Sequence, residues 1–255
     1  MLHALRPSRS LPDRAAADLR SAIHSGGIVN EGRLPSEAQL VEQLGISRAT
    51  LRQAISILEQ EGLVQRRQGQ GTFVVEPVQD LRNRLNDNFG VTDLIEASGS
   101  QPGTRDLEVA VQWADRQMVK RLALPARSRV VVARRVRLAD DRLVAYTIDI
   151  IPATMLADRE VDVETFRRWL EEERSVYRVV ARLGLVIHYG IVTLEPVALE
   201  PKIASALELP AGTLALLMEQ VDYTAEGVAV VHSYEYHHKA VETVQVYRKG
   251  PGPRL

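Results

Sequence analysis

The stretch from Leu34 to Val75 constrains the fold more than any other part of this sequence. Near its start Ser36 can cap a short helix, because a serine hydroxyl accepts a hydrogen bond from a free amide of the first turn. Gly45 ends that helix, and Ser47 can cap a second helix that continues to about Gln60. The stretch therefore begins with two short helices joined by a tight turn.

The second helix has two different faces. Its apolar residues recur at helical spacing, and they are Leu51, Ala54, Ile55 and Leu58. Arg48 and Arg52 lie one turn apart on the opposite face, and no acid occurs on this helix before Glu59. An arginine pair alone is more typical of a solvated helix face than of a binding site.

A glycine-rich hairpin follows the two helices. Two short strands, residues 63–66 and 72–75, flank the tip Gln68-Gly69-Gln70-Gly71, where glycine lets the backbone approach a surface closely. Two helices followed by a wing form an arrangement that reads DNA, with one helix in the major groove. The bland alternative is a solvated helical hairpin. The caps, the buried stripe, the acid-free face and the wing occur in the right order, which favours DNA binding.

These residues also carry a family resemblance. The segments LPSE, SRATLRQAISILEQEGLV and RRQGQGTFV resemble the winged-helix domain of GntR-type transcription regulators across residues 12 to 75. The resemblance implies a set of DNA-contacting positions, which are Ser36, Ser47, Arg48, Thr50, Arg52, Gln68, Gly69 and Gly71. Two positions depart from the family pattern. Ala38 stands where many relatives have arginine, and Ala49 stands where a polar residue is common.

Composition sets broad limits on the function. The 255 residues are 45% hydrophobic and 25% charged, which is ordinary for a globular chain with room for two domains. Without cysteine there is no disulfide framework and no thiolate metal site, in keeping with a reducing cytoplasm. No apolar run approaches membrane-spanning length, and the apolar part of the start is too short for a signal peptide. We therefore expect a cytoplasmic protein without a membrane anchor.

The charge balance is close to neutral, with a net charge of -1, although a DNA binder is usually basic. Residues 1–76 hold nine arginines and eight acids. The arginines of the proposed DNA side are Arg48, Arg52, Arg66 and Arg67. The local electrostatic field of these arginines steers DNA binding more than the net charge of the domain does. Because that net charge is close to zero, we expect modest non-specific affinity for DNA, and we expect specificity to depend on dimerisation.

The sequence divides into a winged helix-turn-helix domain at residues 1–76, a polar linker at 77–88, a second domain at 89–248 and a tail at 249–255. A helix from about Pro12 to His24 precedes the reading pair and is expected to support it. Glu76-Pro77 ends the wing strand, and the asparagine-rich segment that follows is typical of a linker.

The second domain alternates strands and helices. The strand-like runs are Asp106 to Gln112, Val130 to Leu138, Leu143 to Ile151, Leu185 to Leu194, Thr213 to Tyr223 and Val228 to His237. The helix-like runs are Asp115 to Leu122, Val163 to Glu173, Val176 to Leu183 and Pro201 to Leu207. Turn residues at 139–141 and 225–227 predict hairpins. The fold class is therefore α/β overall, of the α+β type, with a largely antiparallel sheet.

A pseudo-repeat runs through this domain. The motif LxLPA at Leu122 recurs at Leu207, and each copy reads helix, LxLPA, strand, turn, strand. We expect two related halves around one sheet. The repeat aligns Arg135 and Arg137 with Gln220 and Asp222, so one half alone carries the cationic pair, whose members share a strand face. On periodicity alone, a solvated strand edge is about as good an interpretation as a binding site.

The second domain resembles the effector-binding, UTRA-like domain of the HutC branch of GntR regulators, whose fold is related to chorismate lyase. The matching segments are RVRLADDRLVAYTIDIIP, SVYRVV, the LxLPA helices and EGVAVVHSYEY. The resemblance implies a small, anionic effector such as a phosphorylated sugar, held by Thr92, Arg135, Arg137 and Ser175, with Tyr177 and His237 on the pocket wall. Thr147 and Val231 replace glutamates of relatives that bind amino-sugar phosphates. The nearby His232, Tyr234 and Tyr236 are candidate substitutes.

Three function classes remain open. The preferred one is a ligand-responsive transcription regulator that binds an inverted-repeat operator in double-stranded DNA as a homodimer. The family resemblance implies that it is a repressor. The second is an enzyme of lyase-like fold, but the six histidines are scattered, and we expect no catalytic group, no metal site and no cofactor. The third is an architectural DNA-binding protein without effector. In the preferred class, we expect the two arginines to repel each other until an anion binds, which leaves the empty pocket mobile.

Overall fold

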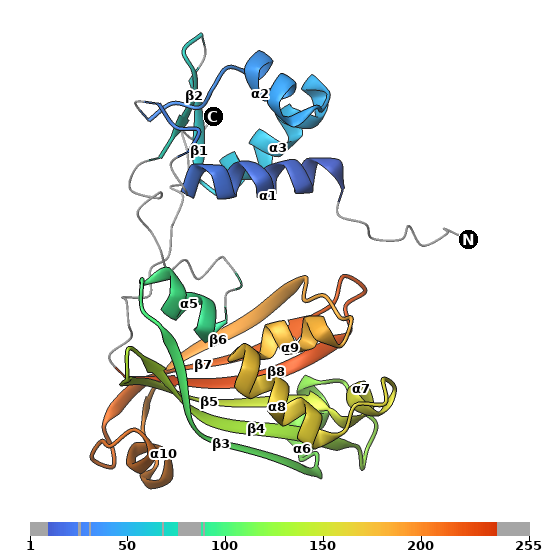
Figure 1. Cartoon of the computed structure of the whole chain (residues 1–255), viewed down its shortest axis with the longest axis vertical. Helices are drawn as coiled ribbons and strands as arrows, with labels where there is room; N and C mark the ends of the chain where they lie inside the picture. Colours follow the sequence, from blue (N-terminus) through green and yellow to red (C-terminus); the bar gives the residue numbers. More distant parts are fainter. Residues whose placement is uncertain are drawn as a thin grey trace, which may run out of the picture. The chain divides into compact units, whose positions relative to one another are not determined.

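The chain was analysed as a computed structural model, which describes residues 10–24, 27–30, 32–67, 69–75, 88 and 90–238. These residues form two compact units, one up to residue 75 and one from residue 88 (Figure 1). The predicted tail at 249–255, and the linker at 77–88 except Asn88, lie outside the described residues. No helix in the described ranges has the length and apolar character that crossing a membrane requires.

The first unit contains three helices and a hairpin. They are α1 (Leu11–His24), α2 (Glu37–Leu44), α3 (Arg48–Gln60), β1 (Val64–Arg67) and β2 (Gly71–Val74). Strands β1 and β2 pair in antiparallel fashion. The predicted elements of this unit are confirmed to within one or two residues at each end.

Local chemistry explains the boundaries of α2 and α3. The Ser36 hydroxyl accepts a hydrogen bond from the backbone amide of Gln39, whose side-chain oxygen accepts one from the Ser36 amide in return. Gly45 ends α2 in the left-handed region at φ +62°. The Ser47 hydroxyl then caps α3 by accepting a hydrogen bond from the amide of Thr50. The turn therefore has the chemistry that both helix ends require.

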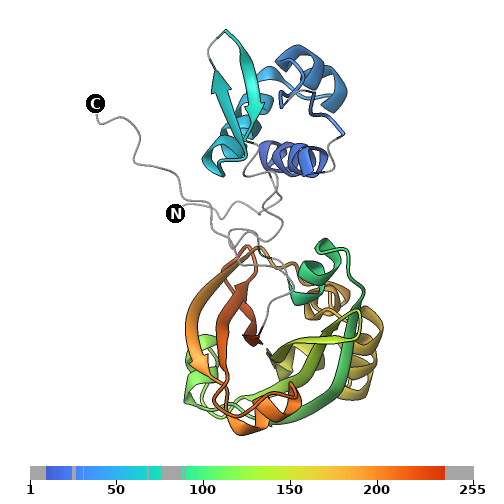
Figure 2. The ribbon, with the colours of Figure 1, turned by 90° about the vertical axis from the view of Figure 1, so that its left-hand side faces the viewer.

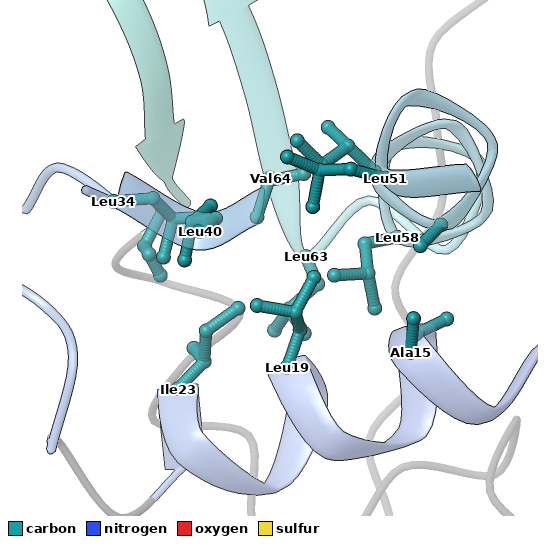
Figure 3. Close-up of a cluster of buried hydrophobic side chains, with 13 residues drawn as sticks. Ala15, Leu19, Ile23, Leu34, Leu40, Leu51, Leu58, Leu63 and Val64 are labelled. Carbon is teal, nitrogen blue, oxygen red and sulfur yellow. The ribbon is translucent and has the colours of Figure 1, made fainter. Parts of the chain in front are cut away.

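The core of the first unit lies between α1, the stripe of α3 and the wing strands (Figure 3). Leu51, Ile55 and Leu58 of α3 are buried and meet Leu19 of α1 and Leu63 before β1. Full burial of such a side chain contributes about 1.5 to 3 kcal/mol. The polar face of α3 is thereby turned outward by packing alone.

The second unit contains a six-stranded antiparallel sheet with the order β3-β4-β5-β8-β7-β6. Its strands are β3 (Pro102–Trp113), β4 (Arg129–Ala139), β5 (Arg142–Pro152), β6 (Tyr189–Ala198), β7 (Leu214–Tyr223) and β8 (Ala229–His237). Its helices are α5 (Val91–Ala97), α6 (Arg116–Arg121), α7 (Ala153–Ala157), α8 (Val163–Glu173), α9 (Val176–Arg182) and α10 (Pro201–Ala206). The antiparallel α+β prediction is confirmed.

Two strand starts differ from the prediction. Strand β6 begins at Tyr189, because Leu185 and Ile187 pack into the core as a connection after α9. Strand β3 begins at Pro102 and is interrupted by a bulge, where Asp106 has a positive φ of 54°. The helices α5 and α7 were not predicted.

The strand order is symmetric about its centre. The hairpins β4–β5 and β7–β8 meet through β5 and β8, and β3 and β6 form the two edges. Helices α6 and α10 begin 85 residues apart, the spacing of the LxLPA motif. The prediction of two related halves around one sheet is therefore confirmed.

The sheet is strongly curved, and its two faces pack against different helices (Figure 2). One face packs against α7, α8 and α9, and the other packs against α6 and α10. Alternate residues of each strand therefore belong to different cores. The face toward α8 and α9 carries three of the six predicted ligand residues, Arg135, Arg137 and His237.

Candidate functional site

The exposed face of α3 carries the side chains predicted to contact DNA. Arg48 and Arg52 are exposed, and the hydroxyls of Ser47 and Thr50 lie 2.8 Å apart at the start of the helix. Arg52 is not free, because its Nε donates to the Glu37 carboxylate at 3.1 Å. An approaching phosphate or base edge must compete with that carboxylate.

The wing adds backbone and arginine groups to this surface. Gly69 has φ +72° at the tip, and a Cβ there would meet nothing within 4 Å. A Cβ on Gly71, in contrast, would lie 2.8 Å from the guanidinium of Arg33. The guanidinium of Arg67 stacks over the Phe73 ring at 4.5 Å. Gln68 lies outside the described residues.

A hollow of about 280 Å³ lies between the wing and the start of α2. Its lining includes three arginines and the cap of α2, namely Arg33, Arg66, Arg67 and Ser36. Guanidinium groups around an open hollow can donate hydrogen bonds to a phosphate oxygen. The structure thus brings Ser36, which was predicted as a DNA contact, next to cations of the wing.

The predicted anion residues of the second unit lie inside the fold. Arg135 and Arg137 have 3% and 1% exposure, and both donate to the carbonyl of Arg174. Arg137 also donates to the Thr92 hydroxyl at 2.7 Å. Arg135 forms a buried ion pair with Asp149 at 2.9 Å. The shared face of the two arginines is confirmed, and the positive charge of Arg135 does act against that of Arg137, although each guanidinium also has partners in the protein.

Burial changes the acid–base behaviour of this group. Desolvation, followed by the nearby charge of Arg135, lowers the pKa of Arg137 to about 9. Burial raises the pKa of Asp149, although the positive charge of Arg135 acts to lower it. Three buried polar atoms on this face have no hydrogen-bond partner within the described ranges: Nε of Arg135, Nε of Arg137 and the hydroxyl of Thr147. The face therefore retains unused hydrogen-bonding capacity.

Ser175 and Tyr177 belong to the start of α9. The Ser175 hydroxyl accepts from the amide of Arg178 and so caps the helix. The Tyr177 hydroxyl lies 3.0 Å from Oδ1 of Asp222 and 3.0 Å from Oδ1 of Asn88. Burial and the charge of Asp222 raise the pKa of Tyr177. Tyr177 is thus engaged with the acidic half of the repeat rather than with the arginines.

Asp222 is fully buried at the centre of this second cluster. Its Oδ1 accepts from the side-chain amide of Asn88 at 2.9 Å and from that of Gln220 at 2.7 Å. Burial raises the pKa of Asp222 to about 6 despite these donors. Gly190 of β6 leaves room for the cluster, since a Cβ there would lie 2.7 Å from Oδ1 of Asp222. Asn88, the last residue of the predicted linker, is therefore fastened to the sheet.

His237 lies on the same sheet face, where its Nε2 is 3.0 Å from Glu235. The suggestion that His232, Tyr234 and Tyr236 substitute for the missing glutamates is wrong. Strand alternation turns them to the opposite face, where His232 pairs with Glu219 at 2.9 Å.

Sequence reasoning missed Asp149 and Glu235. The signal was available, because Asp149 lies two residues after Thr147, and Glu235 lies two residues before His237. Residues two apart on a strand share a face. Within the described residues, no group of three or more histidines and acids is placed to hold a metal ion.

Comparisons with known proteins agree with this organisation. Residues 11–74 match the family model described as bacterial regulatory proteins, gntR family, and residues 97–240 match the UTRA domain. The HTH-type transcriptional repressor NagR of Bacillus subtilis (strain 168) is 30% identical over 216 residues, which cover 84% of this chain and 85% of that protein. The histidine utilization repressor of Pseudomonas aeruginosa is 29% identical over 202 residues, which cover 78% of this chain and 76% of that repressor.

The fold is shared with solved structures. The transcriptional regulator YydK from Bacillus subtilis superposes with a TM-score of 0.74 at 18% identity, and the match covers 93% of this chain and 100% of YydK. At that identity the likeness concerns the fold alone.

Proposed function

The chain belongs to the GntR family of bacterial transcription regulators and has a HutC-type architecture with a UTRA effector domain, and from this premise we propose how it works. The protein is located in the cytoplasm and represses transcription. It binds an inverted-repeat operator as a homodimer, and a small anionic metabolite bound in the second unit changes its operator affinity.

The buried guanidinium groups of Arg135 and Arg137 carry the effector part of this proposal. Among the described residues, the Nε of each has no hydrogen-bond partner, although leaving a buried donor without a hydrogen bond costs about 1 to 3 kcal/mol. A carboxylate or phosphate oxygen matches these donors. The Thr92 hydroxyl contacts Arg137 and the carbonyl of Arg174, the residue before Ser175, which supports a role for both hydroxyls in the anion shell.

The size of the reading head supports a homodimer. One recognition helix and one wing per chain cover too little DNA for specificity, and regulators of this kind gain it from two half-sites one helical turn apart. Exposed Arg48 and Arg52 supply the base and phosphate contacts, and Gln68, Gly69 and Gly71 bring the wing to the backbone.

Selection from a random DNA pool with the full-length protein tests the first half of the proposal. We expect the selected sequences to contain an inverted repeat, bound with a stoichiometry of two chains. Equal affinity for the selected and scrambled duplexes would contradict specific recognition.

A titration on the selected duplex tests the second half. Phosphorylated sugars, phosphonates and organic acids are screened by thermal shift, and each hit is titrated with and without DNA. The coupling must be reciprocal, so the duplex must change ligand affinity by the same factor as ligand changes DNA affinity. DNA affinity that no anion alters would favour the architectural alternative instead.

A promoter reporter tests whether the protein represses or activates transcription. The names of NagR and of the histidine utilization repressor state repression for those proteins. We expect deletion of this chain to raise expression from a promoter that contains the selected site. A fall in expression would indicate activation.

A further inference from the structure

A row of polar side chains crosses three neighbouring strands on the face toward α9. Arg135 of β4 is opposite Thr147 of β5, and Thr147 is opposite Glu235 of β8. Neighbouring strands lie about 4.8 Å apart, so about 10 Å separates the first backbone from the third. A cation, a hydroxyl and an acid therefore follow one another across a span that a small metabolite can bridge.

The middle of this row has no partner. Thr147 is 2% exposed, and its hydroxyl makes no hydrogen bond to any residue the structure describes. Buried side-chain hydroxyls are nearly always hydrogen-bonded in folded proteins. The Nε atoms of Arg135 and Arg137 also lack a partner among the described residues, so this face offers three polar atoms to a ligand.

The acidic end of the row, Glu235, differs from the cationic end, Arg135, in its charged partners. Glu235 is 16% exposed in its side chain and contacts His237 Nε2 at 3.0 Å. Its charge also acts on Arg137, and it adds to burial, the main cause, in raising the pKa of Asp222. Asp149 already neutralises Arg135 at the other end. A ligand bearing only negative charge would thus be attracted by Arg137 and repelled by Glu235.

We propose that Glu235 is a specificity-determining residue that accepts a hydrogen bond from an amine or hydroxyl group of the effector. The acidic group of the same molecule lies at Arg137 and Thr92. The effector class is then a small acid that also carries a hydrogen-bond donor, and a zwitterion fits best because its cationic end is attracted by Glu235. This inference rests on the proposed anion site.

The test compares two ligands that differ in one amine. 2-Aminoethyl phosphate and ethyl phosphate are titrated calorimetrically into the full-length wild type and into Glu235→Gln. A hydrogen bond to a charged group contributes enough for a preference of about tenfold or more. We expect the wild type to prefer the amine by that factor and Glu235→Gln to prefer it by less than about twofold. Glu226→Gln, in the exposed turn before β8, is the matched control and should keep the wild-type preference.

Each other outcome has a definite meaning. An equal preference in the wild type and Glu235→Gln, or a wild-type preference for ethyl phosphate, would overturn the role of Glu235 while leaving the anion site intact. If neither phosphate nor inorganic phosphate binds the wild type, the anion site itself fails and this inference fails with it. Thermal melting of each variant shows whether it is folded. If Glu235→Gln does not fold, Glu235→Asp takes its place. This variant keeps the charge but has a shorter side chain, and it should lose part of the preference for the amine.

Discussion

The arginine pair on α3 of the first unit lies in solvent, whereas the arginine pair of the second unit lies inside the fold. Arg48 and Arg52 are exposed on α3, and Arg52 shares only a surface ion pair with Glu37. Arg135 and Arg137 are almost fully buried and are held by Asp149 and by the carbonyl of Arg174. Surface pairs contribute little to stability, while a buried charge is costly unless it is paired.

This difference separates what each unit can bind. A surface that keeps its cations in solvent can meet a long polyanion such as DNA without refolding. An interior that keeps two guanidinium groups and an unpartnered hydroxyl suits a ligand small enough to be enclosed. The comparison also orders the expected effects of mutation, since removing one partner of a buried pair affects folding, whereas changing an exposed arginine affects binding alone.

The largest expected effect is on stability, at Asp149. Asp149→Ala leaves the Arg135 guanidinium buried without its counter-ion, which should lower the free energy of unfolding by about 3 to 5 kcal/mol. Denaturant unfolding of the full chain measures it. The double variant Arg135→Met, Asp149→Leu should recover much of the loss. A loss below about 1 kcal/mol in Asp149→Ala would show that the pair behaves like a surface pair.

A smaller effect, dependent on pH, is expected at Asp222. Its pKa is raised from 3.8 to about 6, so the folded protein binds this proton more tightly than the unfolded chain does. The stabilisation is fully present below about pH 3.8 and is lost as the pH rises through about 6. The difference between the two pKa values corresponds to about 3 kcal/mol.

Asp222→Asn removes this titration. Relative to wild type, its stability should rise by up to about 3 kcal/mol between pH 4 and pH 7, as measured by denaturant unfolding at each pH. Asp158→Asn changes an exposed carboxylate near α7 and serves as the control, which should show no such rise. A wild-type curve parallel to that of Asp222→Asn would mean that Asp222 titrates as an ordinary carboxyl group.

The same comparison explains which features could be predicted from sequence. The first unit depends on helix caps and on a stripe of apolar residues, and Ser36, Gly45, Ser47 and Leu51 carry those signals locally. The second unit depends on which strands become neighbours, which is a property of distant segments. The shared face of Arg135 and Arg137 follows from strand alternation.

The partners of the arginines could not be predicted in the same way. That Asp149 neutralises Arg135 depends on the register between β4 and β5, and that Arg137 reaches the Arg174 carbonyl depends on the packing of the loop after α8. The same holds for the ion pair between Arg52 and Glu37, which joins two helices. Roles in binding DNA and ligand remain predictions for all of these residues.

Arg52, one of the two exposed arginines of α3, should affect DNA binding without affecting folding. Arg52→Ala should weaken operator binding by about 1 to 3 kcal/mol if the side chain meets a base edge. Arg14→Ala on α1 removes an exposed charge from the supporting helix and should weaken binding less. Fluorescence anisotropy on operator and scrambled duplexes measures both.

A second variant, at the Glu37 carboxylate that contacts Arg52, tests the same contact. Because Glu37 holds the Arg52 guanidinium in the absence of DNA, Glu37→Gln should strengthen binding to both duplexes. Unchanged operator affinity in Arg52→Ala would place base recognition elsewhere on α3.

A modest effect on stability is expected at the wing tip. Gly69 has φ +72° with open space where a Cβ would stand, so Gly69→Val costs backbone strain of about 1 to 2 kcal/mol and causes no clash. A valine there should nevertheless weaken DNA binding, because it keeps the wing backbone away from the phosphates. Thermal melting and anisotropy on the same sample measure the two effects.

Gly99 offers a matched control in the other unit, because it has φ +82° and the same open surroundings. Gly99→Val should therefore impose the same strain as Gly69→Val while leaving operator affinity unchanged. If the two variants lose stability equally but only Gly69→Val loses affinity, the wing glycine serves DNA approach as well as the turn. If both keep their affinity, Gly69 serves only the geometry of the hairpin, and contact with DNA is left to α3 and to the arginines around the hollow.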